Sequence, residues 1–379
     1  HGLSCADYHR EFEKQTQNGY RLTHVSGYLV NGKDFYAAIW EKRRGSAYIA
    51  RHNMTSKGYQ CQFDNQHYQG YRLKHISGYA QGGKARYAAI WESTGAWDSA
   101  DIEHIDSTIK TFMNDNQVSG ASLAITKDGR LVFAKGYGYA DKSKGERVCA
   151  SMAKTLTSAA IMKLVEQGQL RLSDKVFGTG GLLGNTYGSK TYSSAEQAIT
   201  VEHLLEHTAG GNEWDNNKRP PEQDTIGDPM FTNPSYNHNQ LIGWVLDERK
   251  IDTLPGTSYN YSNFGYSILG RIIEKITGLP YESFVRQEIL KPAAIQGMHI
   301  AGEKRPNEVA HDDFEPSLLA RMDSHGGWIG SSIDWTRFLV RIDGFESKPD
   351  ILQPSTLETM TTSSLGRSYA KGLRVNSSN

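Results

Sequence analysis

Apolar and polar positions change their spacing several times along this chain, and each spacing predicts a different element. Residues 100–114 show helical spacing, and residues 120–129 and 130–140 show the alternation that is typical of strands. The dipeptide Asp128-Gly129 between the two strand-like runs is a strong turn signal, so they predict a β-hairpin. Residues 149–170 follow as a strongly apolar run with helical spacing. This region therefore predicts a helix, a hairpin and a buried helix in succession.

Further along the chain, short helical segments alternate with loops. The spacing predicts helices at residues 200–206, 237–250, 266–277, 281–290, 332–341 and 355–362. Residues 177–199 are rich in Gly, Ser and Thr and predict a loop. Residues 212–233 are polar and Pro-rich, and they predict a long surface loop of the kind that often carries specificity.

The first 97 residues contain an internal repeat. The run GYRLTHVSGYLVNGKDFYAAIWE begins at Gly19 and GYRLKHISGYAQGGKARYAAIWE begins at Gly70, which gives a period of 51 residues. The match extends upstream to Tyr8 and Tyr59. Each copy predicts a short polar helix followed by two strands. A copy of this size cannot bury a core alone, so we expect the copies to stack on each other or on the next domain.

Composition limits the classes of protein and partner. A chain of 379 residues with 37% hydrophobic residues is long enough for more than one domain and a large core. Lys and Arg together number 42, as do Asp and Glu, so the zero net charge gives no electrostatic reason to bind nucleic acid or an anionic membrane. Apolar runs stay well short of about eighteen residues, so we expect no transmembrane helix.

Three cysteines are too few for a disulfide scaffold. Alignment of the repeats places Cys5 and Cys61 near the same level of neighbouring helices, so we predict a disulfide between them that leaves Cys149 free. Two buried thiols are the alternative. The sequon that begins at Asn53 fits a secreted glycoprotein. The chain begins at His1 rather than Met, so we expect that any signal peptide is already gone.

The apolar helix carries the first chemical signal. Ser151 opens it, and Lys154 follows three residues later. Residues i and i+3 share one helical face, so the Lys amine can lie beside the Ser hydroxyl. The first helical turn also offers unpaired N–H groups and the positive end of the helix dipole. A nucleophilic Ser needs a base and a place that tolerates negative charge, so the stretch predicts a serine hydrolase of the Ser-x-x-Lys type.

Ser-x-x-Lys alone is a weak signal, because two other pairs match it: Ser107 with Lys110, and Ser368 with Lys371. Only Ser151 follows a predicted hairpin and opens an apolar helix. Ser107 and Lys110 lie inside the preceding predicted helix, where a solvated face explains them.

Tyr261-Ser262-Asn263 is a second motif, and it lies in a turn that runs into an amphipathic helix. A phenol with its usual pKa of about 10 is a poor base at neutral pH. Because a neighbouring Lys ammonium lowers that pKa, we predict Tyr261 as a proton relay between Ser151 and the leaving group. We predict that Asn263 orients Lys154 or a substrate carbonyl. An aromatic turn that merely packs before a helix is the alternative.

The run from His203 to His207, HLLEH, matches a zinc-binding pattern. A third ligand is not evident in the sequence, and the glycines at Gly210 and Gly211 end the helix. We therefore favour structural roles for both His residues and predict neither a metal nor another cofactor.

Residues 100–379 resemble the serine β-lactamase and penicillin-binding-protein superfamily, in its class C and esterase-like branch. The matching stretches are the Ser151 helix, LLEHTAGG from Leu204, PGTSYNYSNFGYSILGRIIE from Pro255 and GGWIGSSIDWTRFL from Gly326. The resemblance implies an α+β fold of the serine β-lactamase/transpeptidase-like class. Such a fold has a mainly antiparallel sheet flanked by helices, plus a helical subdomain.

The same resemblance implies roles for four side chains. Ser151 would be the nucleophile and Lys154 its activating partner. Tyr261 would be the general base, with Asn263 in support. Whether Lys154 or Tyr261 is the principal base stays open.

The repeats resemble the tandem repeat that precedes the hydrolase domain of fungal polyglycine hydrolases, on the pattern GYRLxHxSGYxxxGxxxYAAIWE. Members of that family are secreted proteases that cut Gly–Gly bonds in the linkers of plant class IV chitinases. The resemblance implies a secreted, extracellular enzyme with a protein substrate, and without nucleic-acid or membrane partners. The link to that substrate is the pairing of the two domains, because no single residue identifies glycine.

One departure from the superfamily pattern concerns its third motif, Lys/His-x-Gly, on a strand near the C-terminus. That strand would donate the second oxyanion N–H, whereas residues 369–379 resemble the strand before it. We expect either a piece of a longer protein or a degraded homologue. His325-Gly326-Gly327 fits the motif only superficially, because it lies at an earlier family position.

These patterns together predict two domains: a tandem-repeat module at residues 1–97 and a β-lactamase-like hydrolase domain at residues 98–379. The predicted activity is acyl transfer by a serine peptidase. The alternatives are an esterase or D-amino-acid peptidase of the same family, and a catalytically impaired binding protein in which the repeats are the functional part.

Overall fold

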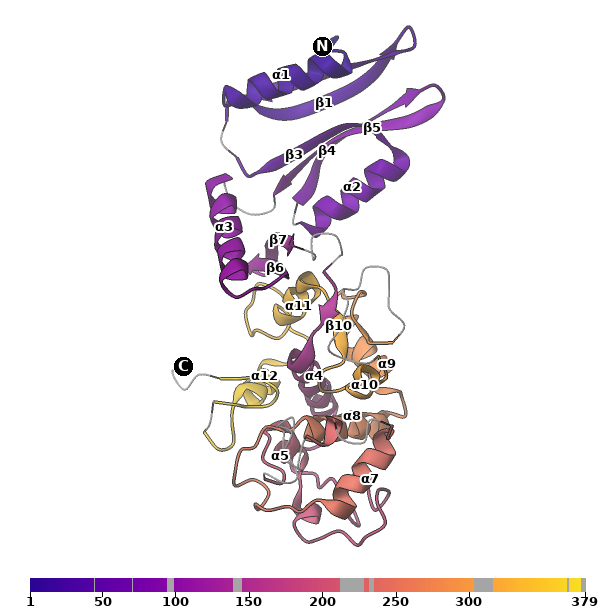
Figure 1. Ribbon diagram of the computed structural model, residues 1–379, viewed down its shortest axis with the longest axis vertical. Helices are drawn as coiled ribbons and strands as arrows, with labels where there is room; N and C mark the ends of the chain where they lie inside the picture. Colours follow the sequence, from indigo (N-terminus) through magenta and orange to yellow (C-terminus); the bar gives the residue numbers. More distant parts are fainter. Residues whose placement is uncertain are drawn as a thin grey trace. The chain divides into compact units, whose positions relative to one another are not determined.

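The computed structural model describes residues 1–43, 45–69, 71–93, 99–138, 145–211, 228–231, 235–302, 316–366 and 368–375. Backbone contacts group the chain into two compact units, His1–Lys144 and Gly145–Asn379. Figure 1 shows both, coloured along the sequence. The predicted domain boundary at residues 97–98 lies inside the first unit, so sequence pattern and backbone contacts divide the chain at different places.

The first unit contains the two predicted repeats, each a helix followed by a hairpin. The elements are α1 (Cys5–Gln17), β1 (Arg21–Val30) and β2 (Lys33–Glu41), and then α2 (Ser56–Tyr68), β4 (Tyr71–Gln81) and β5 (Lys84–Ser93). Ser4 caps α1 and Thr55 caps α2, each with a side-chain oxygen that accepts a backbone N–H in the first turn. The two caps are one repeat period apart, so the same local chemistry begins both helices.

Strand β3 (Tyr48–Thr55) was not predicted. It pairs antiparallel with β5 and makes a three-stranded sheet in the order β3-β5-β4, whereas β1 and β2 form a two-stranded sheet. Met54 pairs with Tyr87 in this sheet, and the isolated bridge between Leu3 and Tyr36 is its counterpart in the first repeat. The first repeat therefore has only a trace of the third strand.

The two repeats stack on each other, which is one of the two predicted arrangements. Their shared core combines residues of both copies: Tyr8, Leu22, Val25, Tyr36, Ala88 and Ile90. Tyr36 and Tyr79 join their hydroxyls at 2.8 Å, and a His75 ring nitrogen lies 2.8 Å from the Val25 carbonyl oxygen. A Cβ on Gly27 would lie 2.2 Å from the Tyr79 ring, so only glycine permits this approach.

The predicted disulfide between Cys5 and Cys61 is wrong, because both are free thiols, and both are exposed rather than buried. One repeat period after Cys5 is Ser56, and Cys61 lies five residues further along α2. Five residues are more than one helical turn, so the two cysteines are not at equivalent levels. Cys5 instead places its Sγ 3.3 Å from Nε2 of His52. Cys149 is free, as predicted, and buried.

The first unit ends with the predicted helix and hairpin. These are α3 (Ser99–Asp115), β6 (Gly120–Lys127) and β7 (Arg130–Gly138). Asp128 and Gly129 have φ angles of 50° and 66°, which are those of the predicted two-residue turn. Asp106 on α3 accepts hydrogen bonds from Lys135 Nζ at 2.6 Å and from the Tyr137 hydroxyl at 2.9 Å, so it fixes the helix on the hairpin.

The second unit is mostly helical. Its elements are β8 (Arg147–Val148), η2 (Ala150–Met152), α4 (Ala153–Glu166), η3 (Glu196–Ala198), α5 (Val201–Leu205), η4 (Pro229–Phe231), α7 (His238–Glu248), α8 (Asn263–Thr277), α9 (Tyr281–Val285), the π-helix η5 (Arg286–Leu290), β9 (His299–Ile300), α10 (Pro316–Arg321), β10 (Trp328–Gly330), α11 (Ser332–Leu339) and α12 (Pro354–Thr361). The three strands form a small antiparallel sheet in the order β8-β10-β9. The helices predicted downstream of residue 200 are all present, with shifts of a few residues at their ends.

Helix α4 lies within the core of this unit. Ala153, Leu156, Ala159, Ala160, Ile161, Met162 and Leu164 are all fully buried. A helix that is apolar on nearly all sides must be covered on all sides, and α8, α9 and α12 are among its neighbours. Its buried hydroxyls are satisfied by later segments, because Thr157 donates to the Ser324 carbonyl at 2.6 Å and Ser158 to the Lys371 carbonyl at 2.6 Å.

The last described segment differs from the predicted strand. Residues 369–374 are closed by one isolated bridge between Tyr369 and Arg374, and residues 376–379 lie outside the described part. The reason is local: Gly372 has a φ of 80°, and its carbonyl accepts a hydrogen bond from Thr155 on α4 at 2.9 Å. The segment therefore turns onto α4. Within the described ranges, no helix has the length and apolar character needed to cross a membrane.

Candidate active site

Ser151 lies in the short 3-10 turn η2, between β8 and α4. Ala150, the residue before it, has a φ of 44°, a conformation that is costly for a residue with a Cβ. The turn is held from behind, because the Cys149 N–H donates to the Trp328 carbonyl of β10 at 2.7 Å. The strained turn presents Ser151 as an exposed residue at the start of a buried helix.

Lys154 is buried directly beneath Ser151, at 1% exposure. Its Nζ lies 3.3 Å from Ser151 Oγ, 2.7 Å from Asn263 Oδ1 and 3.0 Å from the His325 carbonyl oxygen. Three acceptors match the three donors of an ammonium group, and none of them is charged. Burial lowers the pKa of Lys154 to about 7, against the opposing effect of Asp228. Much of the amine is therefore neutral near pH 7 and able to accept a proton.

Tyr261 also contacts Ser151, through a hydrogen bond between the two hydroxyls. The sequence predicted that Lys154 lowers the pKa of Tyr261, and the structure shows the opposite shift. Burial raises that pKa, only partly countered by the Ser151 hydrogen bond. Lys154 Nζ lies over the ring face, 4.8 Å from its centroid. Tyr261 is therefore a protonated phenol at neutral pH, suited to donate a proton rather than to remove one.

Asn263 connects these groups to the rest of the unit. It is the first residue of α8, three residues before the predicted start, because Ser262 caps the helix by accepting the Gly265 N–H at 2.8 Å. Its Oδ1 accepts from Lys154, as predicted for a group that orients that lysine. Its Nδ2 donates to Asp228 Oδ2 at 2.7 Å. Ser151, Lys154, Tyr261 and Asn263 thus lie together.

The two His residues of the zinc-like pattern have separate partners. The His203 Nδ1 accepts the Thr200 N–H at 3.2 Å in a capping box of α5. His207 is fully buried, and its Nδ1 accepts the Ser262 N–H at 3.0 Å. Its ring lies 4.4 Å from that of Tyr261. Burial, followed by the charge of Lys154, keeps the pKa of His207 well below its usual value. Both histidines therefore have the structural roles that we favoured, and His207 holds the Tyr261 turn.

Asp228 is the site residue that sequence reasoning missed. It is 1% exposed and falls within the predicted specificity loop, of which residues 212–227 and 232–233 lie outside the described part. Burial raises the pKa of Asp228, against hydrogen bonds from Asn263 and Met230. A lone Asp in a polar, Pro-rich run carries no pattern that distinguishes it from its neighbours. The sequence singles out His325 only as part of His325-Gly326-Gly327. Its role in the site is that its backbone carbonyl accepts from Lys154 Nζ.

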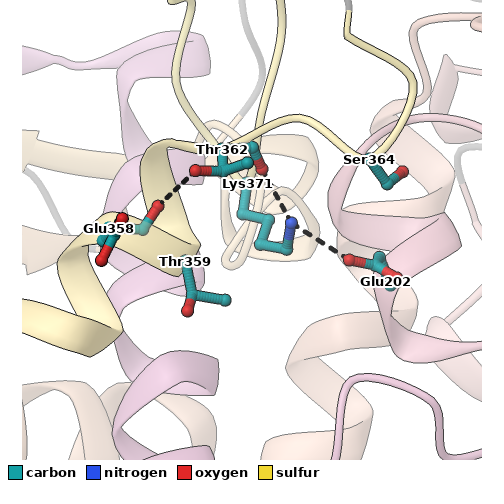
Figure 2. A pocket seen from close by; sticks show the side chains of 6 residues that line it. All are labelled: Glu202, Glu358, Thr359, Thr362, Ser364 and Lys371. Carbon is teal, nitrogen blue, oxygen red and sulfur yellow. Dashed lines mark hydrogen bonds and ion pairs between the residues drawn. The ribbon is translucent and has the colours of Figure 1, made fainter.

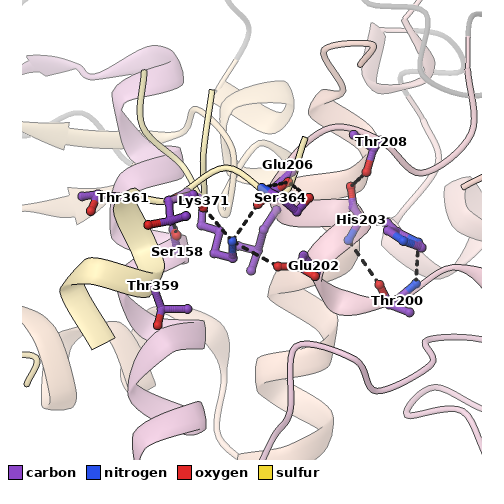
Figure 3. Close-up of polar contacts among 12 residues, drawn as sticks. Ser158, Thr200, Glu202, His203, Glu206, Thr208, Thr359, Thr361, Ser364 and Lys371 are labelled. Atoms are coloured by element: carbon purple, nitrogen blue, oxygen red, sulfur yellow. Dashed lines mark hydrogen bonds and ion pairs between the residues drawn. The ribbon is translucent and has the colours of Figure 1, made fainter. Parts of the chain in front are cut away.

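The other Ser-x-x-Lys matches have different surroundings. Ser107 is exposed on α3, where its hydroxyl donates to the His104 carbonyl at 2.9 Å. Lys371 is buried at 2% exposure, and its Nζ lies 2.6 Å from Glu206 Oε1 and 3.1 Å from Glu202 Oε1. Figure 3 shows Lys371 between these carboxylates. Neither match places its lysine as Lys154 is placed.

A polar pocket of about 340 Å³ adjoins Lys371. Its lining residues are labelled in Figure 2: Glu202, Glu358, Thr359, Thr362, Ser364 and Lys371. Lys371 also donates to the Thr362 carbonyl at 2.9 Å, and the Ser364 N–H donates to Glu206 at 3.0 Å. These contacts fasten the last described segment to α5 and α12, and they are separate from the Ser151 group.

Comparisons with known proteins agree with this arrangement. The sequence model of the family described as Beta-lactamase matches residues 105–375. A second model, described as Polyglycine hydrolase-like, structural repeat, matches residues 1–43 and 45–94. Protein flp of Staphylococcus aureus (strain MRSA252) is 27% identical over 217 residues, which cover 55% of this chain and 40% of that protein. The chain thus spans less than half the length of this relative.

Two solved structures are similar as well. The octameric penicillin-binding protein homologue from Pyrococcus abyssi has a TM-score of 0.53 at 26% identity, covering 72% of this chain and 64% of the other. The D-stereospecific amidohydrolase from Streptomyces sp. has a TM-score of 0.51 at 25% identity, covering 67% of this chain and 77% of the other. Together with the family matches, these likenesses confirm the predicted α+β fold class and the tandem-repeat module before it.

Proposed function

Because this chain belongs to the beta-lactamase family, we propose that it is a serine peptidase that works by acyl transfer, with Ser151 as nucleophile. The observation that carries the proposal is the placement of Lys154. It is a buried amine with three uncharged acceptors and a pKa near 7, and it lies 3.3 Å from the Ser151 hydroxyl. A base of this kind can activate a serine at neutral pH.

The proposed reaction uses three side chains, and their positions support it. Neutral Lys154 takes the Ser151 proton as Oγ attacks the substrate carbonyl, and a tetrahedral intermediate forms. When it collapses, the Tyr261 phenol gives its proton to the leaving amine and regains one from the Lys154 ammonium. A water molecule then gives a proton to Lys154 and attacks the acyl-enzyme, and Ser151 regains its proton as the acid leaves. The Ser151 N–H is one donor for the oxyanion.

The proposed substrate is a protein with a polyglycine linker, and the proposed bonds are Gly–Gly bonds in plant class IV chitinases. Support comes from the domain pairing, since repeats described as polyglycine hydrolase-like precede the beta-lactamase-like part. Glycine offers no side chain to grip, so selectivity would rest on a narrow groove and on backbone hydrogen bonds. We propose that the enzyme is secreted, because it would meet such a substrate outside the cell.

A D-amino-acid amidase or peptidase is the second candidate. It is favoured by the likeness to the Streptomyces D-stereospecific amidohydrolase, at 25% identity over 67% of this chain. Both candidates would use Ser151, Lys154 and Tyr261 in the same way. The two candidates differ in the substrate groove that they require, because a D-amino acid needs room for a side chain on one particular side of the backbone.

The substrate is tested by incubating a chitinase that has a glycine-rich linker with the protein and identifying the products by mass spectrometry. We expect cuts between glycines with wild type and with the matched control Ser107→Ala, and none with Ser151→Ala. Intact chitinase after incubation with wild type would sink the polyglycine assignment. Release of D- rather than L-amino acids from chromogenic amides would then point to the second candidate.

A further inference from the structure

One buried carboxylate beside the candidate site has no part in the proton transfers above. Asp228 begins the segment that forms η4, and both of its oxygens are used. Oδ2 accepts from Asn263 Nδ2 at 2.7 Å, and Oδ1 accepts from the Met230 N–H at 2.9 Å. Arg321 of α10 holds the same segment by donating to the Met230 carbonyl. The carboxylate is therefore fixed in place and directed at Asn263.

The contact decides which way the Asn263 amide faces. A side-chain amide has an acceptor end and a donor end, and an ionised carboxylate can only accept. Asp228 therefore takes the NH₂ end, and the oxygen is left to face Lys154, from which it accepts at 2.7 Å. The reversed amide would set two donors against each other at Lys154 whenever the amine is protonated.

The contact also brings a negative charge near Lys154. Asp228 is the charged group that opposes the effect of burial on the pKa of Lys154. Its own neighbours of opposite charge are Lys154 and Arg249 at the end of α7, and it acts on Arg321 as well. It also raises the pKa of Tyr261. The carboxylate thus acts on both groups that move protons.

We propose that Asp228 is a positioning residue for the reaction: through Asn263 it keeps the amide oxygen toward Lys154, and its charge balances that of the buried amine. The inference rests on the proposed function for its catalytic meaning. The structural part of the inference is that Asp228 is coupled to Lys154 through the Asn263 side-chain amide. This coupling can be measured in protein that has not reacted with any substrate.

Asp228→Asn has a predicted sign. It removes the negative charge that raises the pKa of Lys154, so that pKa falls below about 7. At the distance set by one bridging amide, we expect a fall of about one pH unit. The acid limb of the acylation rate should move to lower pH by the same amount. The direction is the same for Tyr261, because Asp228 raises its pKa too.

The experiment follows the Lys154 side chain by NMR with ¹³C-labelled lysine, between pH 5 and pH 11. Loss of the signal in Lys154→Arg assigns it. Wild type, Asp228→Asn and Asp247→Asn are compared, since Asp247 is a partly exposed carboxylate that accepts a hydrogen bond from the Ser189 N–H. We expect the fall of about one unit in Asp228→Asn and an unchanged value in Asp247→Asn. An unchanged Lys154 titration in folded Asp228→Asn would overturn the inference.

A second measurement needs no variant at Asp228, in case that variant does not fold. The Asn263 side-chain amide, assigned by its loss in Asn263→Ser, should shift in wild type at the pH where Lys154 titrates. An amide that stays constant through that titration would overturn the inference as well. Labelling of Ser151 by a fluorophosphonate is measured in parallel. Its absence in wild type would count against the proposed function alone, because the titrations do not depend on it.

Discussion

Two lysines in the second unit occupy the last position of a Ser-x-x-Lys match, and both are buried: Lys154 at 1% exposure and Lys371 at 2%. Lys154 meets a hydroxyl, an amide oxygen and a carbonyl. Lys371 meets two carboxylates, those of Glu202 and Glu206, and a carbonyl. Neutral acceptors satisfy the hydrogen bonds of the Lys154 amine without strongly favouring its protonated form, whereas the carboxylates around Lys371 form ion pairs with the ammonium. The lysine of the motif is therefore a candidate base at Lys154 and a structural ion-pair partner at Lys371.

The largest expected effect comes from removing the amine next to Ser151. Lys154→Met should slow fluorophosphonate labelling of Ser151 by about 10³-fold, because a positioned base contributes on the order of 10²–10⁴. The rate is measured at pH 8 by intact-protein mass spectrometry. Lys110→Met, from the exposed match on α3, is the control and should react like wild type. Equal rates for Lys154→Met and wild type would end the distinction between the two lysines.

Removing the other buried amine should cost stability instead. Lys371→Met leaves Glu206 buried without its cation, and the loss of one partner of such a pair costs about 3–5 kcal/mol. Urea unfolding followed by tryptophan fluorescence measures the change. Labelling of Ser151 in the folded variant should stay within about threefold of wild type. The double variant Lys371→Met with Glu206→Gln should recover part of the stability, since it removes the unpaired charge.

The pH dependence should separate the two lysines again. Only the neutral Lys154 amine accepts a proton, and burial lowers its pKa to about 7. The labelling rate should therefore rise about tenfold per pH unit below pH 7 and level off above it. Lys371→Met should keep the same acid limb, provided that the variant is folded. A limb that stayed near the usual lysine pKa, above about 10, would show that burial does not set the protonation of Lys154.

The smallest expected effect concerns a single hydroxyl beside the Lys371 ion pairs. Ser364 donates to Glu206 through both its N–H and its hydroxyl, and the N–H bond would remain in Ser364→Ala. A hydrogen bond to a charged group is worth about 1.5–3 kcal/mol, so a loss near 1.5 kcal/mol is expected in urea unfolding. Thr359→Ala is the matched control in the same pocket, because the Thr359 hydroxyl donates to the Ser355 carbonyl of its own helix, α12. Equal losses in both variants would contradict the account of this cluster.

Local signals predicted most elements, because each depends on residues close in sequence. The repeat, the hairpin turn at Asp128-Gly129 and the helix that follows Ser151 are of this kind. Strand β3 was missed because its partner β5 is far along the chain. Helix α8 starts at Asn263 because the Ser262 hydroxyl caps it, and hydrophobic spacing does not register a cap. The prediction of a Cys5–Cys61 disulfide was wrong because the two cysteines lie more than one helical turn apart when the repeats are aligned.

The candidate site shows the same division. Two motifs with fixed spacing indicated Ser151, Lys154, Tyr261 and Asn263, and the structure brings all four together. Asp228 belongs to no motif, because its role depends on where the chain passes after folding. The direction of the Tyr261 pKa shift depends on burial, which outweighs the hydrogen bond from Ser151. Such quantities follow from three-dimensional placement, which spacing alone does not contain.

The most direct test of the account is peptide mapping after reaction with a fluorophosphonate. The protein is labelled at pH 8, digested and sequenced by tandem mass spectrometry. The account predicts one adduct, on Ser151, that is strongly reduced in Lys154→Met and retained in Lys371→Met. An adduct on another serine in folded wild-type protein, or no adduct at all, would contradict the assignment of Ser151 as the nucleophile.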